Sequence, residues 1–164
     1  QREAHFNPRH KKVILLGAGG AARGVAFALL QAGCSRLTIA NRTAAHAERL
    51  VRSLKKSFPK VMLGRMNLAD LPHLGQMDLG FVPDLLVNAT SSSPDFLPKS
   101  RLVSDLVYRP RLTPLLKEAR RRGMKTHEGW SMLLHQGALA FQLWTGRPAP
   151  INLMKRVLLK QLEV

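Results

Sequence analysis

Cysteine, acidic residues and long apolar runs are all scarce in this sequence. Cys34 is the only cysteine, which excludes an internal disulfide and is typical of a protein from a reducing compartment. No apolar run approaches the roughly 20 residues that a membrane-spanning helix needs. The first twelve residues, "QREAHFNPRHKK", are polar and lack the apolar core of a signal peptide. We therefore expect a cytoplasmic protein that does not enter a membrane.

The shortage of acids leaves the chain strongly basic. Ten Asp and Glu residues oppose 26 Lys and Arg residues, which gives a formal net charge of +16. This balance favours an anionic partner: a multiply phosphorylated cofactor, a nucleic acid or an acidic protein surface. The basic runs at 55–56 and 120–122 also fit a solvated surface at helix ends. Aromatic residues make up only 5% and no helix-turn-helix or zinc pattern occurs, so nucleic-acid binding is the weaker hypothesis.

Short apolar runs alternate with amphipathic stretches along the 164 residues, enough chain for one domain with its own core. Strands are predicted at residues 12–16, 36–40, 60–64, 84–88 and 101–107, and helices at 21–32, 44–56, 113–123, 131–145 and about 150–162. The region 66–83 contains Pro and Gly and predicts at most a short helix. The alternation indicates an α/β fold: a doubly wound, mostly parallel sheet with helices on both faces, followed by C-terminal helices.

A glycine turn, "LGAGGAARG", joins the first predicted strand to the first helix. Its residues Gly17 to Ala22 fit the G-x-G-x-x-G/A pattern of Rossmann-like dinucleotide-binding folds, with Ala22 in the last place. In this context Gly17 allows the tight turn, and Gly19 lets the backbone approach a diphosphate at the helix N-terminus. The alternative is a tight turn with a purely structural role.

The end of the second predicted strand distinguishes between two dinucleotides. An NAD-binding protein usually has an acid there for the ribose 2′-hydroxyl, whereas this chain has Asn41, Arg42 and Thr43 and no acid before Glu48. An arginine at this place suits a 2′-phosphate, so the cofactor expected is NADP. In the alternative interpretation Thr43 only caps the next helix and Arg42 is a surface residue. We expect a single NADP-binding Rossmann domain over 1–164, with a linker or tail at 1–11 and C-terminal helices at 131–164.

Five stretches together resemble one enzyme family. They are "LGAGGAARG" (16–24), "ANRT" (40–43), "DLLVNATS" (84–91), "DLVYRPRLTPLL" (105–116) and "EGWSMLLHQGALAFQLWTG" (128–146). In this order they resemble the C-terminal, NADP-binding half of the shikimate dehydrogenases. The resemblance implies the reversible, NADPH-dependent reduction of 3-dehydroshikimate to shikimate, a step towards chorismate and the aromatic amino acids.

The resemblance also implies residue roles. The cofactor-binding set that it implies is Gly17, Ala18, Gly19, Gly20, Ala21, Asn41, Arg42, Thr43, His46, Thr90, Leu106 and Gly129. His46 stands where the family often has Lys or Arg, so binding of the 2′-phosphate is expected to be weaker or pH-sensitive. Tyr108 and Gln136 match positions that contribute to the hydroxylated ring substrate. From the residues alone, Gln136 fits the surface of a helix equally well.

The chain departs from the family pattern in two places. Ser92, Ser93 and Pro94 follow "NATS", where the family usually has x-Gly-Met. Ser93 in place of the glycine, just before a proline, is expected to restrict the loop beside the cofactor. The family also begins with a substrate-binding domain that carries a catalytic Lys–Asp pair, and only a dozen residues precede the first strand here. We therefore expect the chain to lack that domain.

Neither a replacement acid–base pair nor a metal-ligand pattern is evident in the sequence. Lys11, Lys12 and Lys125 fall near strand starts, away from the expected site, while Asp105, Tyr108 and His135 form no evident pair. No catalytic residue is therefore assigned to this chain. Shikimate or 3-dehydroshikimate is expected as a ligand only where a substrate domain is supplied. The alternative function is an inactive NADP-binding module or a truncated relic.

The last two predicted helices are strongly apolar. Their Leu, Met, Phe and Trp faces must fold back on the sheet, self-associate or meet another chain. A homo-oligomer or a partner polypeptide is therefore expected at these helices.

Overall fold

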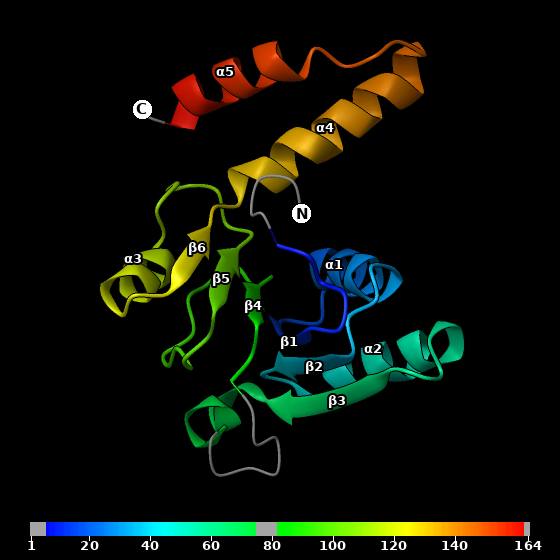
Figure 1. The fold of residues 1–164 in the computed structure, drawn as a ribbon, viewed down its shortest axis with the longest axis vertical. Helices are drawn as coiled ribbons and strands as arrows, with labels where there is room; N and C mark the ends of the chain where they lie inside the picture. The colour runs from blue at the N-terminus through cyan, green and yellow to red at the C-terminus, as the bar shows by residue number, and fades with distance from the viewer. Residues whose placement is uncertain (1–5, 75–81, 163–164) are drawn as a thin grey trace.

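A computed structural model describes residues 6–74 and 82–162 and contains a six-stranded parallel sheet (Figure 1). The strands are β1 (Lys12–Leu16), β2 (Arg36–Asn41), β3 (Met62–Asn67), β4 (Leu85–Asn88), β5 (Leu102–Asp105) and β6 (Lys125–His127). The helices are α1 (Gly20–Gln31), α2 (Ala44–Ser57), α3 (Pro114–Arg121), α4 (Trp130–Thr145) and α5 (Ile151–Leu162), with a 3₁₀ helix η1 (Leu68–His73). The strand order is β3-β2-β1-β4-β5-β6, the order of a doubly wound Rossmann-like fold.

The strand order changes direction at β1. This strand pairs with β2 on one side and with β4 on the other, and Leu16 lies opposite both Ala40 and Asn88. The carboxyl ends of β1, β2 and β4 therefore meet at one edge of the sheet. In open α/β sheets this switch point is where ligands bind.

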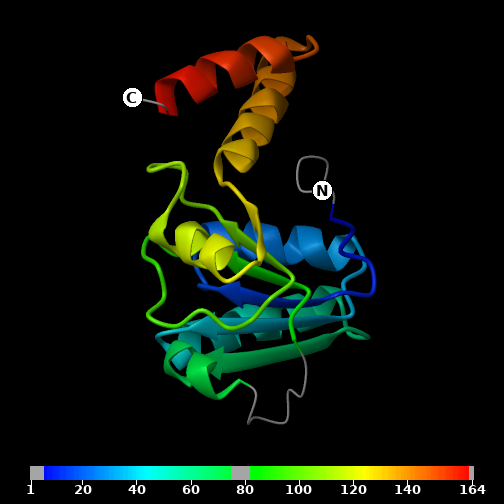
Figure 2. The ribbon, with the colours of Figure 1, turned by 60° about the vertical axis from the view of Figure 1, so that its left-hand side comes forward.

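Both faces of the sheet are buried, because successive residues of a strand point to opposite sides. Val13 and Leu15 pack with α1 and α2, while Ile14 and Leu16 pack with η1 and α3. Figure 2 shows these helices on either side of the strands. Continuous apolar strands are thus explained by helices on both faces.

The structure confirms the expected α/β fold and refines several boundaries. All pairings are parallel, where the sequence predicted a mostly parallel sheet. Strand β3 covers Met62–Asn67 instead of 60–64, and the helix in the weak region is η1. The rest of that region, 75–81, lies outside the described residues. Strand β6, with the sequence KTH, was not among the predicted strands because three half-polar residues carry almost no hydrophobic pattern.

Helices α4 and α5 pack against each other and extend beyond the sheet (Figure 1). Leu143 and Trp144 are 83% and 86% exposed, and no residue of α5 is buried. The apolar faces expected from the sequence are therefore only partly covered in the described chain. No helix in the part that the structure describes has both the length and the apolar character needed to cross a membrane.

Candidate functional site

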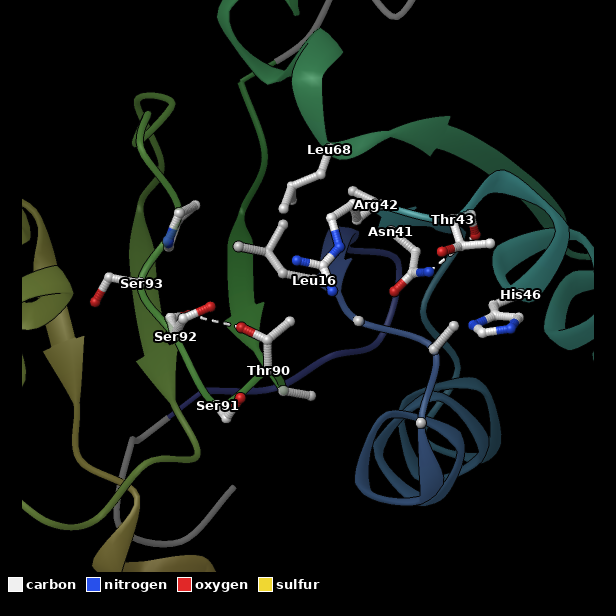
Figure 3. A pocket seen from close by; sticks show the side chains of 16 residues that line it. Leu16, Asn41, Arg42, Thr43, His46, Leu68, Thr90, Ser91, Ser92 and Ser93 are labelled. Carbon is white, nitrogen blue, oxygen red and sulfur yellow. Dashed lines mark hydrogen bonds between the residues drawn. The ribbon is translucent and has the colours of Figure 1, made fainter.

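A pocket of about 380 Å³ lies at the carboxyl ends of β1, β2 and β4 (Figure 3). Four segments line it: the glycine turn (16–19), residues 40–43 with His46, Leu68 at the start of η1, and the loop 89–94. The strand order brings these distant segments together. The pocket therefore occupies the switch point where this class of sheet binds ligands.

The glycine turn forms one wall with its backbone. Gly17 has φ +105, and a Cβ there would lie 3.1 Å from both the Ala89 carbonyl oxygen and the Thr90 methyl carbon, so only glycine fits without strain. Helix α1 then begins at Gly20, and its N-cap residue Gly19 makes no side-chain cap hydrogen bond. The N-cap residue therefore supplies no side-chain acceptor for the first N–H groups of α1, which lie at the positive end of the helix dipole. This arrangement suits a phosphate group.

Polar side chains from the end of β2 form a second wall. Asn41 Nδ2 donates a hydrogen bond of 2.9 Å to the Thr43 carbonyl oxygen, which fixes the loop between β2 and α2. Thr43 occupies the N-cap position of α2 but makes no side-chain cap hydrogen bond, so its hydroxyl remains available to the pocket. Arg42 and His46 complete this wall (Figure 3).

The pocket contains no acidic side chain among the residues described as lining it. The first acid after β2, Glu48, pairs with Arg52 at 3.1 Å and with Arg65 at 3.7 Å. Arg42 therefore carries an unopposed positive charge within the pocket. Electrostatically, this wall favours a dianionic group over a neutral ribose hydroxyl.

Asn88, which is fully buried at the end of β4, positions the loop that lines one side of the pocket. Its Oδ1 accepts hydrogen bonds from the Thr90 N–H (3.1 Å) and the Thr90 hydroxyl (2.7 Å). Its Nδ2 donates to the Ser92 carbonyl oxygen (3.2 Å) and to Asp105 (3.0 Å). Asn88 thus determines where Thr90 and the serine loop lie. Asn88 was not among the site residues predicted from the sequence, although a polar residue at the end of an apolar strand is a signal for such a role.

Asp105 continues this network and is not placed to exchange protons with a ligand. It is buried and accepts hydrogen bonds from the Thr113 hydroxyl (2.7 Å) and the Val107 N–H (3.1 Å). Burial raises the pKa of the Asp105 carboxyl, while hydrogen bonds from Thr113, Val107 and Asn88 act in the opposite direction. Its contacts hold the end of β5 to the start of α3.

The other residues singled out from the sequence lie outside this pocket. Gly20 and Ala21 are exposed in the first turn of α1 and do not line it. Leu106 and Gly129 lie together: a Cβ on Gly129 would come within 2.6 Å of the Leu106 carbonyl oxygen. Tyr108 is 43% exposed just after β5.

The acid–base candidates remain dispersed. Gln136 is exposed on α4, and His135 on the same helix is half-buried. Lys12 and Lys125 begin β1 and β6, at the opposite edge of the sheet from the pocket. Among the described residues no group of three His, Cys, Asp or Glu side chains is placed to hold a metal ion.

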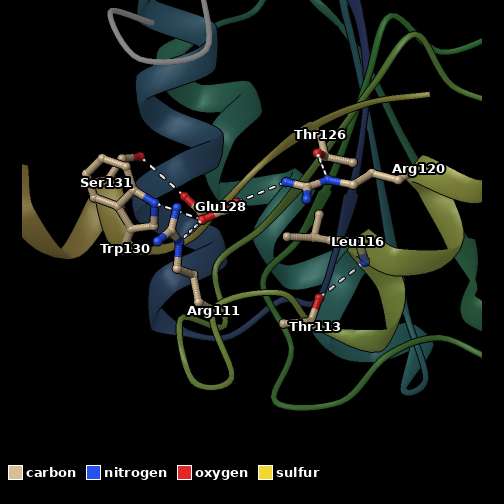
Figure 4. A network of polar contacts seen from close by, with 8 residues as sticks. All are labelled: Arg111, Thr113, Leu116, Arg120, Thr126, Glu128, Trp130 and Ser131. Atoms are coloured by element: carbon tan, nitrogen blue, oxygen red, sulfur yellow. Dashed lines mark hydrogen bonds and ion pairs between the residues drawn. The ribbon is translucent and has the colours of Figure 1, made fainter. Parts of the chain in front are cut away.

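Glu128, which was not among the site residues predicted from the sequence, connects the start of α4 to α3 and to the loop after β5 (Figure 4). Its carboxylate accepts hydrogen bonds from the Arg111 Nε (2.5 Å), the Arg120 Nη2 (3.0 Å) and the Trp130 Nε1 (3.0 Å). Burial pushes the pKa of Glu128 upward, but the hydrogen bonds and charge of Arg111, with Trp130 and Arg120, hold it below its ordinary value. The loop after β5, α3 and the start of α4 are thereby fixed to one another.

The sequence matches the shikimate/quinate 5-dehydrogenase family over residues 2–115. The chain belongs to this family. A second match, to the C-terminal domain of shikimate 5′-dehydrogenase, covers residues 129–159. The sequence-based resemblance to the shikimate dehydrogenases is therefore confirmed.

Family members of known identity resemble the chain over almost its whole length. Shikimate dehydrogenase (NADP(+)) from Moorella thermoacetica is 46% identical across 95% of this chain and 55% of its own length. The chain thus spans little more than half the length of such relatives. The Thermus thermophilus shikimate 5-dehydrogenase solved with NADP(H) and shikimate is 34% identical, with a TM-score of 0.75 over 97% of this chain and 58% of that one. Quinate dehydrogenase from Corynebacterium glutamicum, solved with NAD, gives a TM-score of 0.83 at 28% identity, covering 97% of this chain and 58% of that one.

Proposed function

We propose that this chain is the NADP-binding part of a shikimate dehydrogenase, which interconverts 3-dehydroshikimate and shikimate. The observation that carries the proposal is the pocket wall formed by Arg42, Thr43 and His46, with no acid beside it. A relative that is 46% identical to this chain is a shikimate dehydrogenase (NADP(+)), which supports the same cofactor. When bound, NADPH supplies the hydride that reduces the carbonyl group of 3-dehydroshikimate.

The chain's own residues have distinct roles in this proposal. The backbone of Gly17, Ala18 and Gly19, with Gly20 and Ala21 at the start of α1, holds the diphosphate. Asn41, Arg42, Thr43 and His46 hold the 2′-phosphate, and Thr90 lines the pocket on the side of β4. The backbone of Leu106 and Gly129 contacts the nicotinamide end, and Tyr108 and Gln136 contribute to the ring substrate.

The proton transfer that accompanies hydride transfer requires a general acid–base group. Asp105 is buried, and its carboxylate accepts hydrogen bonds from Val107 and Thr113. The described residues contain no acid–base pair at the pocket. We therefore assign this step to the part of full-length family members that the chain does not span. On its own the chain is expected to bind NADPH without turning over substrate.

The apolar faces of α4 and α5 are proposed as the contact with that other part, or with a second copy of this chain. Leu143 and Trp144 are the most exposed large apolar side chains there. Sedimentation of the wild type and of a Leu143→Ser, Trp144→Ser double variant distinguishes the two: a self-associating chain becomes monomeric, whereas a chain that is already monomeric stays so.

We place the protein in the cytoplasm, where a lone reduced cysteine is usual.

Titration with NADPH and NADH tests the cofactor proposal. Arg42→Ala is expected to weaken NADPH binding about 10- to 100-fold, because charge-assisted hydrogen bonds contribute about 1.5–3 kcal/mol. NADH, which lacks the 2′-phosphate, is expected to bind both proteins equally. Arg49→Ala is the matched control, since it removes the same charge from an exposed position outside the pocket lining. Equal losses for NADPH and NADH, or no binding of either to the wild type, would refute the proposal.

A further inference from the structure

A second basic site lies at the amino ends of the strands, on the opposite side of the sheet from the pocket described above. An open cleft of about 1010 Å³ is formed where β4, β5 and β6 begin, at the opposite ends of the strands from the nucleotide pocket. Five basic side chains and one acidic side chain line it: Lys11, Lys99, Arg101, Arg122, Lys125 and Asp84. These residues come from separate segments that the parallel sheet brings together.

The positive charges in this cleft exceed what its acid neutralises. Asp84 lies 3.8 Å from the Lys11 Nζ and 3.5 Å from the Arg101 Nε, and it also accepts a hydrogen bond from the Lys12 N–H. Its single charge is therefore shared between two cations.

The remaining cations divide into two kinds. Arg122 is engaged by Glu118 and by the Leu97 carbonyl oxygen. Lys99 and Lys125 are exposed and have no acidic partner within the described residues. Two ammonium groups and a partly shared guanidinium thus face a common space. Such an arrangement attracts anions, with lysine acting as a point charge and arginine as a planar fork.

We propose that this cleft binds a compact small-molecule polyanion, one that carries several phosphate or carboxylate groups. The ligand bridges Lys99 and Lys125 and competes with Asp84 for Arg101. Leu102 and Met124 also line the cleft, and both side chains are buried. The five cations in this cleft account for part of the net charge of +16, whereas Arg42 is the one Lys or Arg among the described residues that line the nucleotide pocket.

Occupation of this cleft is independent of the nucleotide pocket. The four residues of β5 span about 13 Å, so the two edges of the sheet are separated by at least that distance. The Debye length is about 10 Å at 0.1 M salt, which screens most of the repulsion between the two bound anions. The inference therefore stands whether or not the NADP proposal is correct.

Calorimetric titration of the whole chain with tripolyphosphate, and separately with citrate, tests the proposal. The protein is first saturated with NADPH, so that any heat reports a second site, and the titration is repeated without NADPH. Binding of tripolyphosphate alone identifies a phosphate ligand, and equal binding of citrate identifies general polyanion recognition. A Lys99→Gln, Lys125→Gln double variant is expected to bind about 30-fold more weakly, since each of the two cations contributes about 1 kcal/mol near an anion in water.

Two further variants make the result specific. Lys55→Gln with Lys56→Gln removes the same charge from exposed positions of α2 and is expected to change affinity less than about twofold. Asp84→Asn keeps an oxygen acceptor for the Lys12 N–H and is expected to tighten binding, because it releases Lys11 and Arg101.

Three results would overturn the inference. They are an equal loss in the α2 control, abolition of binding by saturating NADPH, and an affinity for single-stranded oligonucleotides that rises with their length. An unchanged circular dichroism spectrum and Tm in each variant show that it is folded.

Discussion

Replacing Gly129 by alanine gives the sharpest test of how α4 is joined to the sheet. Gly129 has φ −68 and ψ −20, values that alanine adopts freely, so backbone conformation is not the reason for glycine here. The reason is space: a Cβ would lie 2.6 Å from the Leu106 carbonyl oxygen and 2.7 Å from that of Asp105. Both contacts are with backbone atoms, which do not rotate away as a flexible side chain would.

Relief of these contacts requires the end of β5 to move away from the start of α4. That strand end is held by the Leu106 N–H, which donates to the Asn88 carbonyl oxygen at 2.9 Å. Overpacking of this kind typically costs about 1–3 kcal/mol. For a chain of this length, Gly129→Ala is therefore expected to lower the Tm by about 2–10 °C.

Gly24→Ala is the matched control and is expected to act in the opposite direction. Gly24 lies inside α1, and nothing is within 4 Å of an added Cβ. Alanine there is expected to stabilise the protein by about 0.5–1 kcal/mol, since it favours the helix more than glycine does. Thermal unfolding followed by circular dichroism measures both variants. A Gly129→Ala protein as stable as the Gly24→Ala protein would refute the steric account.

Three further outcomes are expected. Asn88→Leu removes the amide that bridges two strand ends and is expected to lower the free energy of unfolding in urea by about 2–4 kcal/mol; a loss below about 0.5 kcal/mol would contradict the network's importance. The lowered pKa of Glu128 means that its stabilising contribution is present above its unfolded pKa and is lost as pH falls through the folded value. The stability difference between wild type and Glu128→Gln, measured by Tm, should therefore shrink in acid, and a constant difference from pH 7 to pH 3 would refute this. Burial raises the pKa of Cys34 to about 11, so this thiol should react slowly with a disulfide reagent at pH 8 and rapidly in urea.

The sheet was predictable because its central strands are short runs of consecutive apolar residues. The sequence of β1 (KVILL) has four consecutive apolar residues and that of β4 (LLVN) has three, as strands covered on both faces require, and a glycine turn follows the first of them. Once the strands are parallel, their carboxyl ends share one edge of the sheet, which brings together residues that are far apart in the sequence. The structure places Gly17, Arg42 and Thr90 around one pocket for this reason.

The features that the sequence did not reveal depend on contacts made only after folding. Strand β6 has three residues with little hydrophobic pattern, and it is a strand because β5 offers it a free edge. Glu128 looks like a surface residue until α3 and the loop after β5 bring Arg120 and Arg111 to it. Its partners lie 8 and 17 residues away, a separation that helical or strand periodicity does not connect.

The large positive charge also shows why composition locates a site poorly. A net charge of +16 favoured an anionic partner, yet Arg42 is the one always-charged side chain among the described residues that line the nucleotide pocket. In the NADP proposal, selectivity for a phosphate there depends on the absence of one acid at the end of β2 and on backbone N–H groups, neither of which alters the net charge much. The surplus of cations lies elsewhere, with a cluster at the amino ends of β4, β5 and β6. Charge and cofactor choice are thus separate properties of this chain, and Arg42→Ala and the Lys99, Lys125 variant should affect different ligands.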